Sequence, residues 1–200
     1  MLTQDIWLIV GLGNPGPKYA DSWHNCGWLA LDHLAEHERI AINRIKFKGL
    51  YGMGTIKGQK VILLKPTTFM NNSGESVRAA MDYFRVEREN VLLLYDDLDV
   101  AKGLVRIREK GGAGTHNGMR SVVRHLGGTD FPRIRIGIGP LPPNWDIIDY
   151  VLSSITADER PLMEEALSDC CEAVAFAMEK DIQFAMNRIN RRKLNPKEDR

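Results

Sequence analysis

The chain has 200 residues, of which 44% are hydrophobic and 26% are charged, and its formal net charge is +1. These values support one large domain, or less readily two small ones, with a real hydrophobic core. No apolar run approaches the roughly 18 residues that a membrane span needs, which excludes an integral membrane protein of the helical kind.

The three cysteines and the N-terminal residues bear on the cellular compartment. Cys26, Cys170 and Cys171 form no CxxC pair, no metal-ligand spacing and no disulfide framework, a pattern typical of a reducing compartment. Residues 1–10 lack the basic start and the long apolar core of a signal peptide. We therefore expect a soluble cytoplasmic protein.

Apolar runs and helical periodicities alternate along the chain and predict the secondary structure. Residues 39–46 read as a loop and 139–143 as a turn-rich link. The expected elements are strands over 6–10, 47–56, 61–65, 91–95, 104–108 and 134–138, and helices over 26–35, 73–84, 119–126 and, in two apolar stripes, 156–189.

Interleaved strands and helices without a break in composition predict a single α/β domain. We expect a twisted mixed central β-sheet flanked by helices, with a C-terminal helical segment. The domain is predicted to span residues 1–190, and residues 191–200 are predicted to form a flexible, basic and polar tail.

The loop after the first strand contains Gly11, Gly13 and Gly16 in the spacing GxGxxG, which is typical of dinucleotide binding. That fold begins a helix within the glycine run, so that the helix N-terminus holds a pyrophosphate. Here Pro15 and Pro17 occupy that place, and the helical periodicity begins only after His24. Dinucleotide binding therefore remains a minor alternative.

Two further patterns carry other chemistry. The segment from His33 to His37 reads HLAEH, which matches a zinc motif, but nothing in the sequence marks the third ligand that the motif needs. Cys26 lies two residues from His24, but sequence neighbours rarely have the geometry of a nucleophile and its base. We predict no metal site. If the protein uses a nucleophile, water is a better candidate for it than Cys26.

Polar groups follow three separate apolar strands. Asn14 and His24 follow the first strand, Met70 and Asn71 follow the strand ending near Leu64, and Asp96 follows the strand ending at Tyr95. If these strands are neighbours, their carboxyl ends converge on one crevice. A carboxylate bonded to an imidazole suits the activation of water by a general base, and side-chain amides can orient a polar substrate or stabilise an oxyanion. The alternative is that Asp96 caps a turn and His24 is structural.

Basic residues are concentrated in one part of the chain. Between Lys102 and Arg135 there are eight Lys or Arg residues against two acidic ones, and Arg106 and Arg108 share one face of a strand. Glycines surround His116 and Asn117 beside them. A local basic surface on a nearly neutral protein suits phosphate or nucleic acid, although a solvated face is the ordinary interpretation.

In the segments that contain these polar, glycine-rich and basic positions, the sequence closely resembles the bacterial peptidyl-tRNA hydrolase family. The matching segments are IVGLGNPGPKYADSWHNCG, LLKPTTFMNNSG, LLLYDDLDVAKG, GGAGTHNGMRS and FPRIRIGIG. The resemblance runs from about Ile6 to Asn190. It implies an esterase that cleaves peptidyl-tRNA into a peptide and free tRNA, as a monomer without a metal or organic cofactor.

The resemblance also implies roles for individual residues. His24 matches the general base, Asp96 the carboxylate that keeps it basic, and Asn14 an asparagine that helps distinguish blocked from free aminoacyl-tRNA. In the mechanism that we expect, Asn71 or backbone amides steady the oxyanion, and Asn14 and Asn117 position the peptide backbone. The other matches are substrate-cleft positions at Tyr19, Phe69, Met70, Asn71, His116 and Asn117, and tRNA-phosphate positions at Arg106, Arg108 and Arg135, of which the last two resemble a clamp on the 5′-phosphate.

Three residues depart from the family pattern. Trp23 stands where a basic residue is common, and Ala113 and Thr115 interrupt a loop that is usually richer in glycine. Two other functions stay open beside hydrolysis of peptidyl-tRNA. One is a non-catalytic RNA-binding relative of the same fold, and the other is the dinucleotide-binding enzyme discussed above.

Overall fold

Seven strands form one mixed sheet in the computed structural model, which describes residues 6–193. The order is β2-β3-β4-β1-β5-β7-β6, and β4, β1, β5 and β7 run parallel to one another. The strands are β1 (Ile6–Gly11), β2 (Arg44–Lys46), β3 (Gly49–Ile56), β4 (Gln59–Pro66), β5 (Val91–Ala101), β6 (Val105–Arg108) and β7 (Arg133–Gly139).

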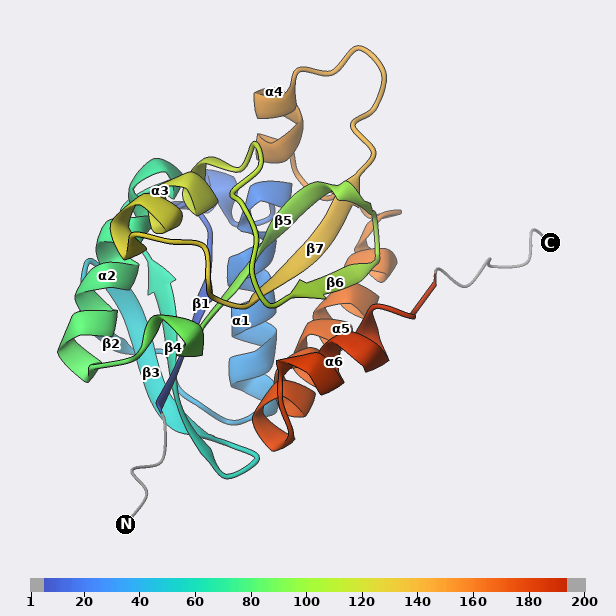
Figure 1. Ribbon diagram of the computed structural model, residues 1–200. Helices are drawn as coiled ribbons and strands as arrows, with labels where there is room; N and C mark the ends of the chain where they lie inside the picture. The colour runs from blue at the N-terminus through green and yellow to red at the C-terminus, as the bar shows by residue number, and fades with distance from the viewer. Residues whose placement is uncertain (1–5, 194–200) are drawn as a thin grey trace.

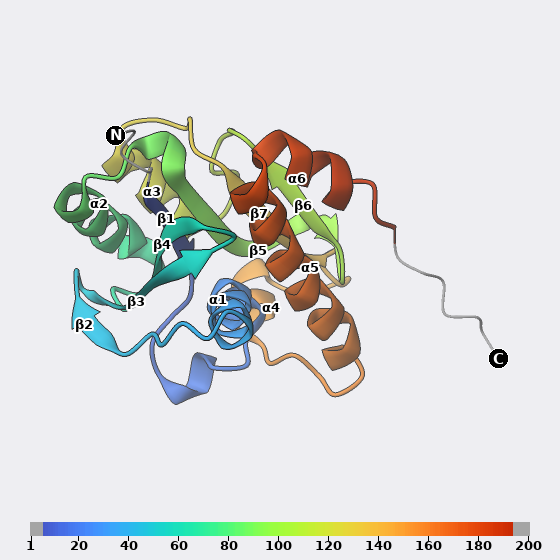
Figure 2. The same ribbon diagram turned by 90° about the horizontal axis from the view of Figure 1, so that it is seen from below.

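Helices cover both faces of this sheet (Figure 1 and Figure 2). Helices α1, α5 and α6 pack with Ile9 and Leu94 on one face, whereas α2 and α3 pack with Leu8 and Val10 on the other. The helices are α1 (Cys26–His37), α2 (Ser73–Phe84), α3 (Asn117–Leu126), α4 (Ile147–Leu152), α5 (Arg160–Glu179) and α6 (Ile182–Ile189), with short 3₁₀ turns at Pro17–Tyr19, Trp23–Asn25, Met70–Asn72 and Arg88–Asn90.

The apolar runs of β1 and β5 are explained by this layering. Successive side chains of a strand point to opposite faces, and both faces are covered, so Leu8, Ile9 and Val10 are all fully buried. The mixed α/β sheet with flanking helices predicted from the sequence is therefore confirmed.

The structure corrects several element boundaries. The segment predicted as a loop over 39–46 contains β2, a three-residue strand whose side chains are all exposed. Phe47 and Lys48 lie outside the strand that was expected to begin there, because positive φ angles of 57° and 51° place them in the turn between β2 and β3. Helix α4, which follows the predicted link, was not predicted at all.

Strand β5 is longer than expected, and the difference matters for the site. Asp96 was predicted to follow the strand, but it lies within β5, opposite Ile136 of β7. On its other side β5 pairs with β1 only as far as Leu94, opposite Gly11. Because β1 ends there, Asp96 projects beyond its neighbour while its own backbone stays in the sheet.

The C-terminal segment covers the outer edge of the sheet. Asn190 accepts a hydrogen bond from the Ile107 N–H and donates one to the Ile107 carbonyl of the edge strand β6, at 2.7 and 3.0 Å. Arg192 forms ion pairs with Asp169 and Glu172 of α5. Most of the tail predicted from residue 191 lies outside the described residues. Among the helices of residues 6–193, none has the length and hydropathy to cross a membrane.

Candidate active site

A pocket of about 550 Å³ opens where the parallel strands end at their carboxyl side. The strands β4, β1 and β5 are neighbours, so the predicted convergence of the polar groups that follow them is confirmed. Of the residues singled out in the sequence, the pocket is lined by Asn14, His24, Phe69, Met70, Asn71, Asp96, Arg108, His116, Asn117 and Arg135.

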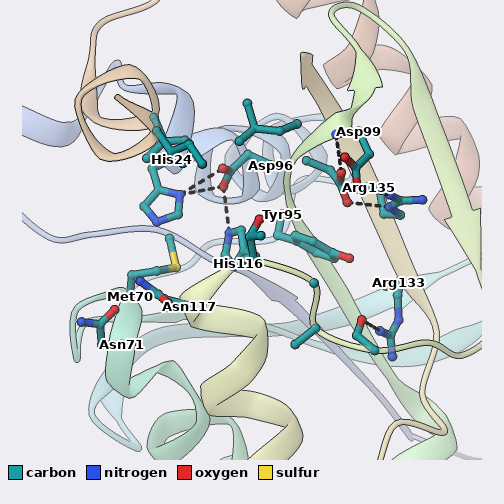
Figure 3. Close-up of a pocket in the computed structure, with 18 of the residues that line it drawn as sticks. His24, Met70, Asn71, Tyr95, Asp96, Asp99, His116, Asn117, Arg133 and Arg135 are labelled. Carbon is teal, nitrogen blue, oxygen red and sulfur yellow. Dashed lines mark hydrogen bonds and ion pairs between the residues drawn. The ribbon is translucent and has the colours of Figure 1, made fainter. Parts of the chain in front are cut away.

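Asp96 lies between two histidines at the centre of this pocket (Figure 3). Its carboxylate oxygens are both 3.0 Å from Nδ1 of His24, and one of them is 3.0 Å from Nε2 of His116. The Asp96 side chain is 3% exposed and that of His24 is 12% exposed. The buried carboxylate therefore binds two imidazoles, His24 and His116, that are far apart in the sequence.

The hydrogen bonds fix how each neutral imidazole carries its proton. The N–H of Met119 donates to Nδ1 of His116 at 3.1 Å, so the His116 proton resides on Nε2 and is donated to Asp96. His24 donates from Nδ1 to Asp96, which leaves the lone pair on its Nε2 free. His24 is thus prepared to accept a proton on the side away from Asp96.

These three side chains also place three possible metal-ligand atoms within 4.8 Å of one another. A metal would need the Nε2 lone pair of His116, but that nitrogen carries the proton, because Nδ1 accepts from the Met119 backbone. The residues therefore fit a hydrogen-bonded network better than a metal site. No three-ligand cluster within residues 6–193 includes His33 or His37, so the HxxEH motif has no assembled site in this range.

The pKa values of His24 and Asp96 are shifted in opposite directions. Burial by itself would lower the pKa of His24, but the charge of Asp96 and their hydrogen bond outweigh it and raise that pKa above its ordinary value of 6.5. Burial would raise the pKa of Asp96, but His24 and His116 hold it well below its usual range. Asp96 is thus ionised whenever His24 titrates, and it makes His24 a stronger base.

Asn14 is held rigidly beside this pair. Its backbone N–H and carbonyl are both bonded by the side chain of Asn25, at 2.9 and 3.0 Å. Its side-chain oxygen accepts the Met70 N–H at 2.7 Å. These contacts orient the amide and leave its NH₂ group, in the pocket wall, without a partner among residues 6–193. Asn14 can therefore donate a hydrogen bond to a bound molecule.

Basic residues line the other half of the pocket (Figure 3). Nε of Arg135 donates to Asp97 at 2.6 Å, and this bond raises the pKa of Arg135, so the charge is fixed in place. Arg108 and Lys110 have no hydrogen bond or ion pair to any residue from 6 to 193, so their charges are available to an anion.

Two residues implied by the resemblance lie elsewhere. Tyr19 belongs to the 3₁₀ turn before His24, where the Lys18 ammonium lies 4.6 Å from its ring, and it does not line the pocket. Arg106 shares a strand face with Arg108 but donates to the carbonyls of Val105 and Arg192. The structure thus brings ten of the twelve selected residues to one pocket.

Gly11 and Gly13 of the GxGxxG pattern are required by close packing against α1. A Cβ at Gly11 would lie 2.2 Å from the carbonyl oxygen of Gly27, and one at Gly27 would lie 2.3 Å from that of Leu94. The N–H of Trp28 in the first turn of α1 donates to the carbonyl of Leu12. Helix α1 therefore packs directly onto the sheet, and this first-turn donor bonds to the protein itself.

Comparisons with known proteins identify the family. The model of the peptidyl-tRNA hydrolase family matches residues 8–197. Peptidyl-tRNA hydrolase of Clostridium acetobutylicum is 47% identical over 189 residues, covering 94% of this chain and 100% of the relative, and that of Bacillus subtilis is 46% identical over 183 residues, covering 92% and 97%. The chain belongs to the peptidyl-tRNA hydrolase family.

A solved structure supports the same assignment. The crystal structure of peptidyl-tRNA hydrolase from Acinetobacter baumannii superposes with a TM-score of 0.89 at 38% identity, covering 96% of this chain and 98% of that one. The resemblance recognised in the sequence and the fold class expected from it are both confirmed.

Sequence reasoning missed parts of this pocket. Ile147 and Ile148 of α4 line it, and both are exposed at 44% and 63%. Arg133 also contributes to the wall, and Asn25, which belongs to the first loop, supports Asn14 from behind. Two adjacent exposed apolar residues are a weak signal for a binding surface, and nothing local distinguishes Arg133 from its basic neighbours.

Proposed function

We propose that this protein hydrolyses the ester bond that joins a peptide to the terminal ribose of tRNA. The observation that carries the proposal is the buried Asp96 carboxylate bonded to Nδ1 of His24, in a pocket that is also lined by Arg108 and Lys110, whose charges have no partner among residues 6–193. Membership of the peptidyl-tRNA hydrolase family supports the same reaction. Release of free tRNA and peptide would recycle tRNA for translation, in the cytoplasm, by a monomer without a cofactor.

His24 acts as the general base in the proposed mechanism. Its free Nε2 removes a proton from a water molecule, which attacks the ester carbonyl. Asp96 keeps the imidazole in the required tautomer and stabilises the imidazolium that forms. The imidazolium then returns the proton to the departing ribose oxygen, so that a hydroxyl group leaves and His24 is neutral again.

The amides of the pocket hold the substrate in this proposal. Asn14 presents its NH₂ group to the peptide, because its side-chain oxygen is already bonded to Met70. Asn71 steadies the oxyanion that develops on the ester carbonyl, and Asn117 positions the peptide backbone. Phe69, Met70 and His116 complete the walls, and the 55% exposed ring of Phe69 offers an apolar surface.

The cationic half of the pocket binds the tRNA. Arg108 and Arg135 lie on the neighbouring antiparallel strands β6 and β7 and both line the pocket. We propose that they contact phosphates of the acceptor end while the ester bond reaches His24. Arg106, which is already bonded to two carbonyls, contributes to the basic surface at the edge of the sheet.

Replacing His24 by Ala tests the mechanism. We expect kcat for N-acetylaminoacyl-tRNA to fall by about 10²- to 10⁴-fold, the usual contribution of a general base, while binding of uncharged tRNA is retained. His33→Ala, on α1 and away from the pocket, is the matched control and should keep the wild-type rate. A His24→Ala variant with near wild-type turnover would refute the mechanism.

The same release assay separates the proposal from a non-catalytic RNA-binding relative. Binding of tRNA by the wild-type protein without release of the blocked amino acid would favour that second function. We expect release instead, because the base, its carboxylate and the supporting amides are all present in one pocket.

A further inference from the structure

Arg133 differs from the other basic residues of the pocket in its burial. It is the first residue of β7, it lines the pocket, and only 1% of its surface is exposed. In the close-up its guanidinium lies on the opposite side of the pocket from His24 and points to the neighbouring loop (Figure 3). Its position alone would place it among the residues that bind phosphate.

The hydrogen bonds of Arg133 leave no donor for a phosphate. A guanidinium has five N–H groups, and the structure gives each of them a backbone carbonyl. Nη1 donates to Gly111 at 2.5 Å and Gly112 at 3.1 Å, Nη2 donates to Thr129 at 3.0 Å and Phe131 at 3.1 Å, and Nε donates to Phe131 at 3.4 Å.

The surroundings stabilise this cation without a carboxylate. None of the ion pairs between residues 6 and 193 includes Arg133, so the carbonyl dipoles must solvate the charge. The guanidinium also lies 4.5 Å from the centre of the Phe131 ring, a cation–π contact. A phosphate could bond this guanidinium only by displacing these backbone carbonyls, which would then lose their donors, and a buried acceptor without a donor is costly.

The bonds join two segments that flank the sheet edge. Gly111 and Gly112 belong to the loop that leaves β6 after Arg108, the residue opposite Arg133 in the sheet. Thr129 and Phe131 precede β7, and the Gly111 N–H also donates to the Thr129 carbonyl. The loop continues to His116, which bonds Asp96 and caps α3. Arg133 therefore holds the start of a glycine-rich loop whose end reaches the catalytic carboxylate.

We propose that Arg133 is a positioning residue that fixes this loop through the Gly111 and Gly112 carbonyls, and that it does not contact the tRNA backbone. The inference rests on the proposed function, because it assigns a role in that reaction. It separates Arg133 from Arg108, whose charge has no partner among the described residues and faces the same pocket.

Two substitutions of the full-length protein test the proposal. Arg133→Lys keeps the charge but offers one compact ammonium in place of the planar fork that spans both segments, and Arg133→Gln removes the charge. For each variant that remains folded in a thermal melt, three quantities are measured. They are the dependence of the tRNA dissociation constant on salt, kcat and KM for N-acetylaminoacyl-tRNA, and amide hydrogen exchange of residues 112–116 without ligand.

We expect the salt slope of both variants to equal that of the wild type. The loop amides should exchange faster, and kcat should fall by about ten- to a hundredfold with a smaller change in KM, because the reacting groups are misplaced. Arg108→Gln is the control, and its slope should decrease by about 0.9, the value of one lost phosphate contact on a duplex, with unchanged loop exchange.

Two results would overturn the proposal. One is a salt slope for Arg133→Lys or Arg133→Gln that decreases as much as that of Arg108→Gln, and the other is loop exchange that stays at the wild-type rate in both variants. If the wild-type protein neither bound nor cleaved the tRNA substrate, the proposed function would fail. In that case hydrogen exchange of the free protein would still decide whether Arg133 fixes the loop.

Discussion

At the scale of single residues, the site depends on a carboxylate that serves two imidazoles. Asp96 accepts from Nδ1 of His24 and from Nε2 of His116, and the Met119 N–H fixes the tautomer of the second ring. Because His116 can only donate to Asp96, it cannot compete for the proton that His24 removes. In the proposed mechanism His24 is therefore the base, and His116 supports Asp96.

Asp96→Asn should change the pKa of His24 in a defined direction. The charge of Asp96 is what raises that pKa against the effect of burial, so its removal leaves burial, and the pKa should fall below 6.5. A histidine NMR titration of wild type and variant measures this shift. The amide can also donate to Nδ1, which favours the wrong tautomer, so we expect kcat to fall by about 10²- to 10⁴-fold.

The wild-type pH profile follows from the same pKa. His24 must be neutral to act as a base, so kcat/KM should fall as pH decreases through a pKa above 6.5. Asp96 does not contribute to this fall, because its own pKa lies well below its usual range and it stays ionised. A profile whose acidic limb lay near pH 4 would contradict the assignment of His24 as the titrating group.

At the scale of elements, the close contact between α1 and the sheet places His24 beside Asp96. Gly27 in the first turn of α1 lies against the backbone of both β5 and the Leu12 segment. His24 precedes Gly27 by three residues, and Asp96 follows Leu94 by two. The distance between the His24 and Asp96 side chains therefore depends on how closely the helix packs, and only glycine permits this approach.

Gly27→Ala tests this dependence. The added Cβ would lie 2.3 Å from the Leu94 oxygen and 2.6 Å from the Leu12 oxygen, and backbone atoms cannot move away cheaply. We expect the free energy of unfolding to fall by about 1–3 kcal/mol, as for other overpacked sites, and kcat to fall because α1 moves from β5. Gly112→Ala, where a Cβ would have no atom within 4 Å, is the control for stability. Equal melting temperatures of Gly27→Ala and wild type would contradict the argument.

The elements that the sequence failed to predict share a physical cause. Strand β2 has three exposed residues and therefore no apolar periodicity, and it exists because it pairs with β3. Helix α4 has six residues with Ile147 and Ile148 exposed, and it begins where Asp146 accepts from two backbone N–H groups. By contrast, β1 and α1 bury whole faces, and their patterns were sufficient to predict them.

In the site, too, the features with a local sequence pattern could be predicted, and those that depend on tertiary contacts could not. We could predict that the polar residues after β1 and β4 lie near Asp96, which follows an apolar run. Parallel strands bring such positions together at one edge of the sheet. The bonds of Arg133 to Gly111 and Thr129 depend on a loop conformation that no local pattern specifies. The use of Gly11 and Gly27 for packing likewise requires the tertiary structure, since GxGxxG alone fits a different fold.

At the scale of the whole molecule, the pocket divides into two halves with different physical chemistry. One half contains His24, Asp96 and Asn14, of which Asp96 and Asn14 are buried, and works through hydrogen bonds. The other contains the cations of Arg108, Lys110 and Arg135, of which only Arg135 is paired within the described residues, with Asp97 and Asp99, although the whole chain has a net charge of only +1. Charged groups exposed to solvent are screened by salt, whereas buried hydrogen bonds are screened much less.

A shortened substrate should distinguish the contributions of the two halves of the pocket to kcat/KM. For N-acetylaminoacyl-tRNA we expect kcat/KM to fall steeply with rising salt, because phosphate contacts release counterions. For an N-acetylaminoacyl-adenosine, which lacks the acceptor stem, kcat/KM should be lower and nearly independent of salt. His24→Ala should lower kcat for both substrates by about 10²- to 10⁴-fold, whereas Arg108→Gln should affect only the tRNA substrate. Equal salt dependence of the two substrates would mean that the cationic half does not bind the acceptor stem.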